Sequence, residues 1–464
     1  MHFPDATSSP TRRGKSGHKP FADMAFLGGT VHVLDEGRRV AQALAVIGDT
    51  IAAVGSKSEV EGWIGPETKI ISTEGRAVLP GINDAHLHAV WFGAQWPRLM
   101  FESSDVGWHS RLLCSEQDRI AAIRKAWQEL ARLGITSYTE PGIGPGEDDG
   151  ETGCFGTAVL ETYASLAGSR EQTARVTLLR LFGYLDGPSS IDDYRRGLET
   201  PAPSADSRWL SIPGVKIFAD GIPPMRTAWT NEPYRDGGHG ALLTGDGNEQ
   251  ERLCDFRTMV SMAHERGLQV AVHATGDRTI EEFISVVEKL GGAERLGHYV
   301  IHGDLITREQ IERLKSARMG IALQPLIADQ TADWLAKAVS EATVKQAWPM
   351  DKLVGNALNA ILSSDAPVAS PDWRRVIASA ALQLERRDVV VDEGILTELL
   401  RMYTAIPAIQ DGAADWKGTL EVGKVADICV LEHDPLAIGA SALPNIEVDM
   451  TMVGGRIVHE RAIN

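Results

Sequence analysis

Apolar and polar positions alternate in short runs at both ends of the chain. Near the amino-terminal end, β-strands are predicted over 25–34, 43–47, 51–54 and 69–72, with turn residues between them. The carboxyl-terminal end shows the same alternation of apolar and polar positions, with strands predicted over 426–431, 446–453 and 456–459. Neither set has enough strands to bury a face by itself, so we expect the two ends to pair into one small β-sandwich.

The middle of the chain follows a different pattern, in which apolar strands alternate with amphipathic helices. Strands are predicted over 81–86, 135–140, 176–184, 215–219, 269–273, 299–303, 320–324 and 360–364. Helices are predicted between several of them, over 116–133, 249–266, 279–290 and 307–317. Eight such units in order predict an α/β fold of the (β/α)8 TIM-barrel type.

These patterns divide the chain into four parts. We predict a loose arm over 1–23, the two parts of the β-sandwich over 24–80 and 411–464, and a barrel domain over 81–410. The arm is rich in Ser, Pro, Arg and Lys and lacks an apolar core of the length that a signal sequence needs. The stretch 326–355 is long for a connection between two barrel strands, and insertions of this length over a barrel's active face tend to be lids.

Composition narrows the class of protein. The 464 residues are 43% hydrophobic and 23% charged, which is ordinary for a globular protein without a membrane span. A formal charge of -17 argues against nucleic acid or an anionic membrane as the main partner. The cysteines, Cys114, Cys154, Cys254 and Cys429, lie far apart and form no CxxC pair, so a reducing, cytoplasmic setting is the simplest interpretation.

Candidate chemistry falls where the predicted strands end. His86 and His88 stand at i and i+2 near the end of the first strand, a spacing that turns both imidazoles to one face. The fourth, fifth, sixth and eighth strands contribute four further candidates, Lys216, His273, His302 and Asp365. Catalytic residues of TIM barrels lie at the carboxyl ends of the strands, so we expect these side chains to meet. Neutral imidazoles suit Zn²⁺ or a similar metal.

The order His-x-His, Lys, His, His and Asp on successive strands resembles the amidohydrolase superfamily. The segments 79–88, 215–221, 272–277 and 364–367 are similar to those of its family 3, often called YtcJ-like, and 418–427 resembles that family's return into the sandwich. The resemblance implies a metal-dependent hydrolase of a C–N bond in an amide, an N-acyl amine or a cyclic amide. It also implies that Asp365 binds metal and acts as general base and acid.

The resemblance gives Lys216 a role that its ordinary chemistry would not. In relatives, a lysine at this place reacts with carbon dioxide, and the carbamate bridges two metal ions. One or two Zn²⁺ per chain are therefore expected, with two favoured. The alternative is an unmodified Lys216 that pairs with a nearby acid such as Asp220 and leaves a single metal.

Substrate residues are less sharply indicated. Arg226 follows the fourth strand, where its cation would meet a carboxylate or carbonyl of a small-molecule substrate. Trp91 follows the histidine pair, and its ring would line an aromatic pocket. A structural role for either side chain is the alternative. Oligomers are common on this scaffold, so a homodimer is a weak expectation.

Two other functions fit the same residues. A deaminase, or a non-hydrolytic lyase or isomerase, would use the same metal barrel. Deaminases of the superfamily generally carry an acid three positions after the fifth-strand histidine, where this chain has Gly276. A metal-binding module without catalysis is the remaining alternative, and the presence of all six candidate ligands disfavours it.

Overall fold

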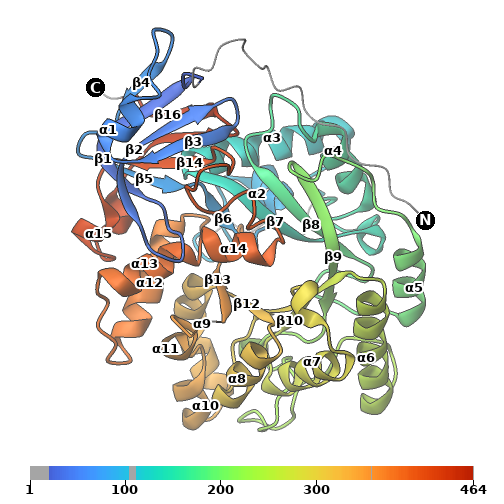
Figure 1. Cartoon of the computed structure of the whole chain (residues 1–464). Coiled ribbons are helices and arrows are strands. Elements are labelled where there is room, and N and C mark those ends of the chain that lie inside the picture. Colours follow the sequence, from blue (N-terminus) through green and yellow to red (C-terminus); the bar gives the residue numbers. More distant parts are fainter. Residues whose placement is uncertain (1–19, 104–110, 357, 463–464) are drawn as a thin grey trace.

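The computed structural model describes residues 20–103, 111–356 and 358–462. Most of the arm predicted over 1–23 lies outside the described residues. The remainder forms two parts, a barrel and a sheet built from both chain ends, and Figure 1 shows the blue amino-terminal strands beside the red carboxyl-terminal ones.

The barrel contains eight parallel strands within the described parts of the chain, and each pairs with its neighbour in sequence. Their bounds are β6 (Ile82–Asp84), β7 (Ile135–Ile143), β8 (Arg175–Leu181), β9 (Leu210–Phe218), β10 (Gln269–Ala274), β11 (Tyr299–His302), β12 (Gly320–Leu323) and β13 (Asn359–Leu362). The first and last strands meet just beyond their carboxyl ends. There the Ser364 N–H donates to Asp84 Oδ1 at 3.1 Å, and the Asp365 N–H donates to the His86 carbonyl at 2.7 Å. The predicted barrel is therefore confirmed.

Helices surround the barrel, and the short helix Lys57–Glu61 packs instead on the amino-terminal strands of the end sheet (Figure 1). Their bounds are α1 (Lys57–Glu61), α2 (Ala89–Gln95), α3 (Glu116–Arg132), α4 (Thr157–Leu166), α5 (Ile191–Glu199), α6 (Glu249–Glu265), α7 (Asp277–Leu290), α8 (Arg308–Ser316), α9 (Pro325–Ala338), α10 (Glu341–Gln346), α11 (Met350–Leu353), α12 (Trp373–Glu385), α13 (Glu393–Arg401), α14 (Ala405–Gln410) and α15 (Pro435–Ile438). The four predicted helices, α3, α6, α7 and α8, are confirmed to within two residues at each end. Three of them begin at capping boxes, led by Ser115, Asn248 and Thr307, which satisfy backbone donors that a helix start leaves free.

The strands of the two chain ends join in one continuous hydrogen-bonded sheet. Its members are β1 (Met24–His32), β2 (Val40–Ile47), β3 (Thr50–Gly55), β4 (Lys69–Ser72), β5 (Ala77–Pro80), β14 (Ile428–Leu431), β15 (Val448–Val453) and β16 (Arg456–Glu460). The junction is the antiparallel pair of β5 and β14, in which Leu79 lies opposite Cys429. Phe26, Val78 and Met452 share one buried core, so both ends contribute to the same apolar interior, as expected.

The insertion predicted as a lid over 326–355 is helical and contains α9, α10 and α11. Helix α9 follows the seventh barrel strand, yet it packs against the short 3-10 turn Pro223–Met225 that follows the fourth. Its Trp334 ring lies 6.0 Å from the ring of Phe101, which follows the first strand. Because α9 contacts segments that leave distant strands, we infer that it crosses the carboxyl end of the barrel.

Candidate metal centre

Four histidines and one aspartate converge at the carboxyl end of the barrel. The ring centroids of His86 and His88 are 5.4 Å apart, those of His86 and His302 are 5.4 Å apart, and those of His273 and His302 are 4.5 Å apart. Asp365 Oδ1 lies 3.2 Å from His86 Nε2 and 3.4 Å from His88 Nε2. Donor atoms of His86, His302 and Asp365 all lie within 4.8 Å of one another, a spacing that fits one metal ion.

The donor atoms support a metal rather than a hydrogen-bonded polar cluster. His86, His88 and His273 are each at most 5% exposed, and the Nδ1 atom of each has no hydrogen-bond partner among the described residues. Buried polar atoms are nearly always hydrogen-bonded, so these unsatisfied ring nitrogens show that the hydrogen bonds of the described residues do not fully account for the cluster. Imidazole nitrogens with a carboxylate oxygen form a donor set that zinc accepts.

The backbone aims two of these side chains by adopting an unusual conformation. His302 has φ 74° and Asp365 has φ 59°, both in the left-handed region that side-chain-bearing residues rarely enter. The Nδ1 atom of His302 lies 2.8 Å from Gln324 Oε1, which leaves Nε2 free to face the centre. Such backbone conformations are costly and tend to persist at functional sites.

Electrostatics distinguishes the histidines. Burial lowers the pKa of His86 to about 3 and that of His302 to about 4, so both are neutral and available as ligands. Burial opposes the charge of His88 too, but the nearby carboxylates of Asp365 and Glu140 raise its pKa to about 9. The position between these two carboxylates therefore favours a positive charge, which a metal ion would supply in place of the proton.

Comparison with known proteins agrees with the family resemblance seen in the sequence. The sequence model of the amidohydrolase family matches residues 105–459, which is more than half of the chain. This chain belongs to the amidohydrolase family. The match contains the barrel strands from β7 to β13 and reaches the carboxyl-terminal strands of the end sheet, and it does not by itself identify a substrate.

Two curated relatives resemble this amidohydrolase. It is 30% identical to the putative amidohydrolase YtcJ of Bacillus subtilis, over 55% of this chain and 48% of the relative, so the match spans about half the length of each. It is 22% identical to the N-substituted formamide deformylase of Arthrobacter pascens, over 95% of this chain and 98% of the relative.

Two solved structures share the fold. An uncharacterized metal-dependent hydrolase from Pyrococcus furiosus has a TM-score of 0.68 at 20% identity and covers 89% of this chain and 99% of its own. The atrazine chlorohydrolase TrzN from Arthrobacter aurescens TC1, solved with zinc, has a TM-score of 0.61 at 16% identity, over 94% and 95% of the two chains. At these identities the likeness is one of fold.

Lys216 lies in the same centre of this amidohydrolase. It is 1% exposed, and its Nζ lies 4.6 Å above the ring of Phe218. Burial lowers the pKa of Lys216 to about 7, so a large share of the amine is neutral at physiological pH. Asp220 does not pair with it. The Asp220 oxygens accept hydrogen bonds from the backbone of Trp229, Thr275 and Gly276 and from the Thr279 hydroxyl.

The sequence analysis missed Glu140 and Gln324, which support the ligands. Glu140 is fully buried within β7 and accepts hydrogen bonds from the Ala89 N–H at 2.8 Å and the Tyr163 hydroxyl at 2.8 Å. Its Oε1 lies 3.6 Å from His88 Nδ1. Both residues close predicted strands, so the strand-end rule that selected the ligands would have found them had it been applied to every polar residue type.

The two predicted substrate residues lie in different surroundings. Trp91 is 9% exposed, and its ring lies 6.2 Å from that of His88, beside a cavity. Arg226 is on the surface, where its Nε pairs with Asp236 Oδ1 at 3.0 Å. The structure therefore brings Trp91 to the centre and leaves Arg226 outside it, because the turn after β9 directs the arginine to solvent.

Two further features of the chain bear on the expectations from its sequence, its cysteines and its helix lengths. All four cysteines are free thiols, and Cys154 and Cys429 are buried. Within the described ranges, no helix combines the length and the apolar character needed to cross a membrane.

Proposed function

We propose that this chain hydrolyses a carbon–nitrogen bond in a small amide, N-acyl amine or cyclic amide. The observation that carries the proposal is the Asp365 carboxylate beside the Nε2 atoms of His86 and His88, where it can act on a water between them and a carbonyl. The name of the Arthrobacter relative, an N-substituted formamide deformylase, supports a C–N bond as the target.

Zinc is the metal we propose, held by His86, His88, His273, His302 and Asp365. Their imidazole nitrogens and single carboxylate match its preferences, and donor atoms of His86, His302 and Asp365 lie within 4.8 Å of one another. When bound, zinc supplies Lewis acidity, which lowers the pKa of a coordinated water to about 7.

The proposed proton transfers belong to Asp365. Although burial opposes it, the neighbouring His86 and His88 hold the pKa of Asp365 well below its usual range, so it starts as a carboxylate. It takes one proton from the attacking water as the water oxygen bonds to the carbonyl carbon. It then gives that proton to the leaving nitrogen as the C–N bond breaks, which releases a carboxylic acid and an amine.

Lys216 is proposed to carry a carbamate that holds a second zinc ion. The neutral amine adds to carbon dioxide, forming an N–C bond and releasing a proton. Its burial supports this, as does the lack of an ion-pair partner within 4.0 Å in the part of the chain that the structure describes. Asp220, the alternative partner, is already engaged by four donors.

Deamination is the weaker candidate because the expected acid is missing. Gly276 stands three positions after His273, and its N–H donates to Asp220 Oδ2 at 2.9 Å. A backbone donor turned toward a carboxylate cannot replace an acid that transfers protons to a ring nitrogen.

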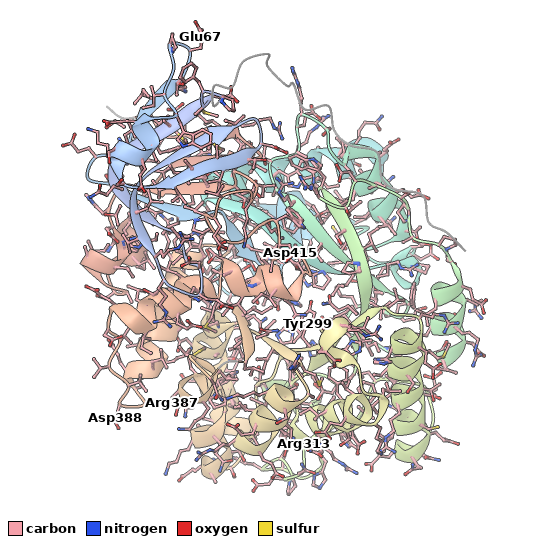
Figure 2. All side chains as sticks on the ribbon, viewed as in Figure 1. Glu67, Tyr299, Arg313, Arg387, Asp388 and Asp415 are labelled. Carbon is pink, nitrogen blue, oxygen red and sulfur yellow. The ribbon has the colours of Figure 1, made fainter. Side chains whose placement is uncertain are left out.

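The test compares two aspartates that share a backbone conformation. Asp365 has φ 59° and Asp388 has φ 60°, and Figure 2 shows Asp388 at the surface, far from the barrel's centre. With zinc-loaded protein and a panel of formamides, N-acetyl amines and cyclic amides, Asp365→Asn should lower kcat/KM by about a thousandfold. Asp388→Asn should leave it unchanged, and both should keep the far-ultraviolet circular dichroism of the parent.

Two results would contradict the proposal. Unchanged turnover in Asp365→Asn would remove this carboxylate from the mechanism. Failure of the zinc-loaded parent to hydrolyse any amide in the panel, while it releases ammonia from aminated heterocycles, would favour deamination instead.

A further inference from the structure

A cavity of about 750 Å³ lies against one wall of the candidate metal centre. Trp91 and Phe155 line it, and the ring of Phe155 also lies 5.4 Å from the ring of His88. The two aromatic rings are 5.8 Å apart in an edge-to-face arrangement, and both lie close to the ring of His88, so the cavity borders the centre. The cavity therefore lies where the part of a substrate beyond the scissile bond would extend.

Aromatic rings form much of the cavity wall. Besides Trp91 and Phe155, it is lined by Phe182 at the end of β8 and by Tyr184, which is 56% exposed. The π faces of such rings attract organic cations, and ammonium ligands are bound in this way between aromatic side chains. An apolar wall alone would accept a neutral arm equally well, so the charged residues decide the class of ligand.

The charged residues that line this cavity are mainly acidic. Glu147, Asp149 and Glu151 come from the segment after β7, and Asp193 and Arg196 lie on α5. Arg196 pairs with Asp193, so this arginine and this aspartate compensate each other. Glu147 is half-buried, and its Oε1 accepts a hydrogen bond from the Leu185 N–H at 2.7 Å, which fixes the carboxylate at the wall.

Asp186 adds a further acid next to a residue that lines the cavity. It follows Leu185 in the loop after β8, with φ 50°, and its side chain reaches solvent. Even so, the surrounding protein raises the pKa of Asp186, and the charge of Asp365 raises it further, while those of Lys216 and His88 oppose the rise.

We propose that this cavity binds a cationic, ammonium-bearing arm of the substrate, so that the preferred amides carry a positive charge on an aromatic or short apolar spacer. The inference rests on the proposed amide hydrolysis and names its substrate class. The rings enclose the spacer, and Glu147 and Asp149 face the ammonium group.

Three amides of matched shape test the charge preference. All are N-acetyl derivatives of a para-substituted benzylamine, with the second substituent being aminomethyl (cationic), ethyl (neutral) or carboxymethyl (anionic). For the zinc-loaded full chain, kcat/KM should fall by about tenfold from the cationic to the neutral amide, and further for the anionic one. Equal values, or a preference for the anion, would overturn the proposal.

Paired variants locate the preference in the cavity. The double variant Glu147→Gln, Asp149→Asn should remove the cation preference while leaving kcat/KM for the neutral amide within about twofold. Glu67→Gln removes one negative charge at the far tip of the end sheet, as Figure 2 shows, and should leave the preference intact. Retention of the preference in the double variant would exclude this cavity.

A binding measurement separates this proposal from the proposed function. If none of the three amides is hydrolysed, amide hydrolysis is wrong, and titration calorimetry then decides the cavity. Binding of 4-ethylbenzylammonium, weakened about tenfold in the double variant and stronger than binding of 4-ethylbenzyl alcohol, would support a cation site. Equal binding of the two compounds would reject it.

Discussion

The two ends of the barrel treat buried histidines in opposite ways. At the amino end of the strands, His298 Nδ1 accepts a hydrogen bond from the Val270 N–H at 2.9 Å, and its Nε2 lies 2.9 Å from His264 Nδ1. Both of its ring nitrogens are therefore satisfied. At the carboxyl end, His86 and His273 each keep an Nδ1 without a hydrogen-bond partner among the described residues.

This difference separates stability from chemistry within one fold. Satisfied polar groups at the amino end lock neighbouring strands together, as Gln269 does by donating from Nε2 to the carbonyls of Gly297 and Gln410. Unsatisfied groups at the carboxyl end are costly until a ligand reaches them. The same residue type is thus structural at one end and available for binding at the other.

The largest expected effect comes from removing the amine of Lys216. Lys216→Met keeps the length of the side chain, so the variant should fold, but it should reduce the metal content from about two to about one zinc per chain and lower kcat/KM more than about a hundredfold. Elemental mass spectrometry on protein purified without chelator gives the count.

The matched control is at the other end of the barrel. Lys315 donates to Asn356 Oδ1 at 3.2 Å, so Lys315→Met should leave metal content and turnover as they are. A single zinc in the unmodified chain, unchanged in Lys216→Met, would refute the carbamate bridge.

Much of this contrast could be predicted from the sequence. The eight strands follow from apolar runs between turn residues, and His86, His88, His273 and His302 stand out because histidine is rare at consecutive strand ends. Their register brings them together in the fold. His273 and His302 were predictable because a strand fixes both the position and the face of each residue. The strand predicted over 81–86 ends at Asp84, so His86 and His88 lie in the segment that follows it.

Residues in turns could not be placed in the same way. Arg226 was expected to face the substrate. Its direction depends on its own left-handed backbone conformation after the turn Pro223–Met225 and on its ion pair with Asp236, ten positions further on. The partnership of Glu140 with His88 joins two different strands, so it needs their register as well as their sequences. Local pattern gives the strand ends but not the contacts between them.

A smaller effect on zinc binding is expected from changing Glu140, the carboxylate beside His88. Glu140→Gln removes the negative charge that lies 3.6 Å from His88 Nδ1 but retains a group of the same size, so zinc affinity should fall by about 10- to 100-fold. Competition with a zinc-chelating dye measures this directly. Glu129→Gln alters a buried glutamate on α3 that pairs with Lys125, and it should leave zinc affinity unchanged. Equal affinities in both variants would show that Glu140 is only structural.

The smallest effect concerns the amino end and depends on pH. Burial, together with His264, lowers the pKa of His298 to about 4, against about 6.5 for an unfolded histidine. The neutral ring therefore stabilises the fold fully above pH 6.5, and this contribution is lost as the pH falls from 6.5 toward 4. Between pH 6.5 and 5.5 the loss is about 1 kcal/mol.

Urea unfolding can isolate this contribution. His298→Gln retains an acceptor for Val270 but does not titrate, so its free energy of unfolding should fall less than that of the parent over the same pH interval. Zinc content should stay the same in both proteins. Parallel pH curves would mean that His298 is not the group responsible.

The pairing of β5 with β14 has a consequence for synthesis of the chain. These neighbouring strands are separated by the whole barrel, which the ribosome must produce before β14 appears. At ordinary elongation rates this takes on the order of tens of seconds, during which β5 has no antiparallel partner and exposes an open edge. The sheet of the two chain ends is thus completed last, and interrupted synthesis would leave a nascent protein whose unpaired β5 edge is prone to aggregate.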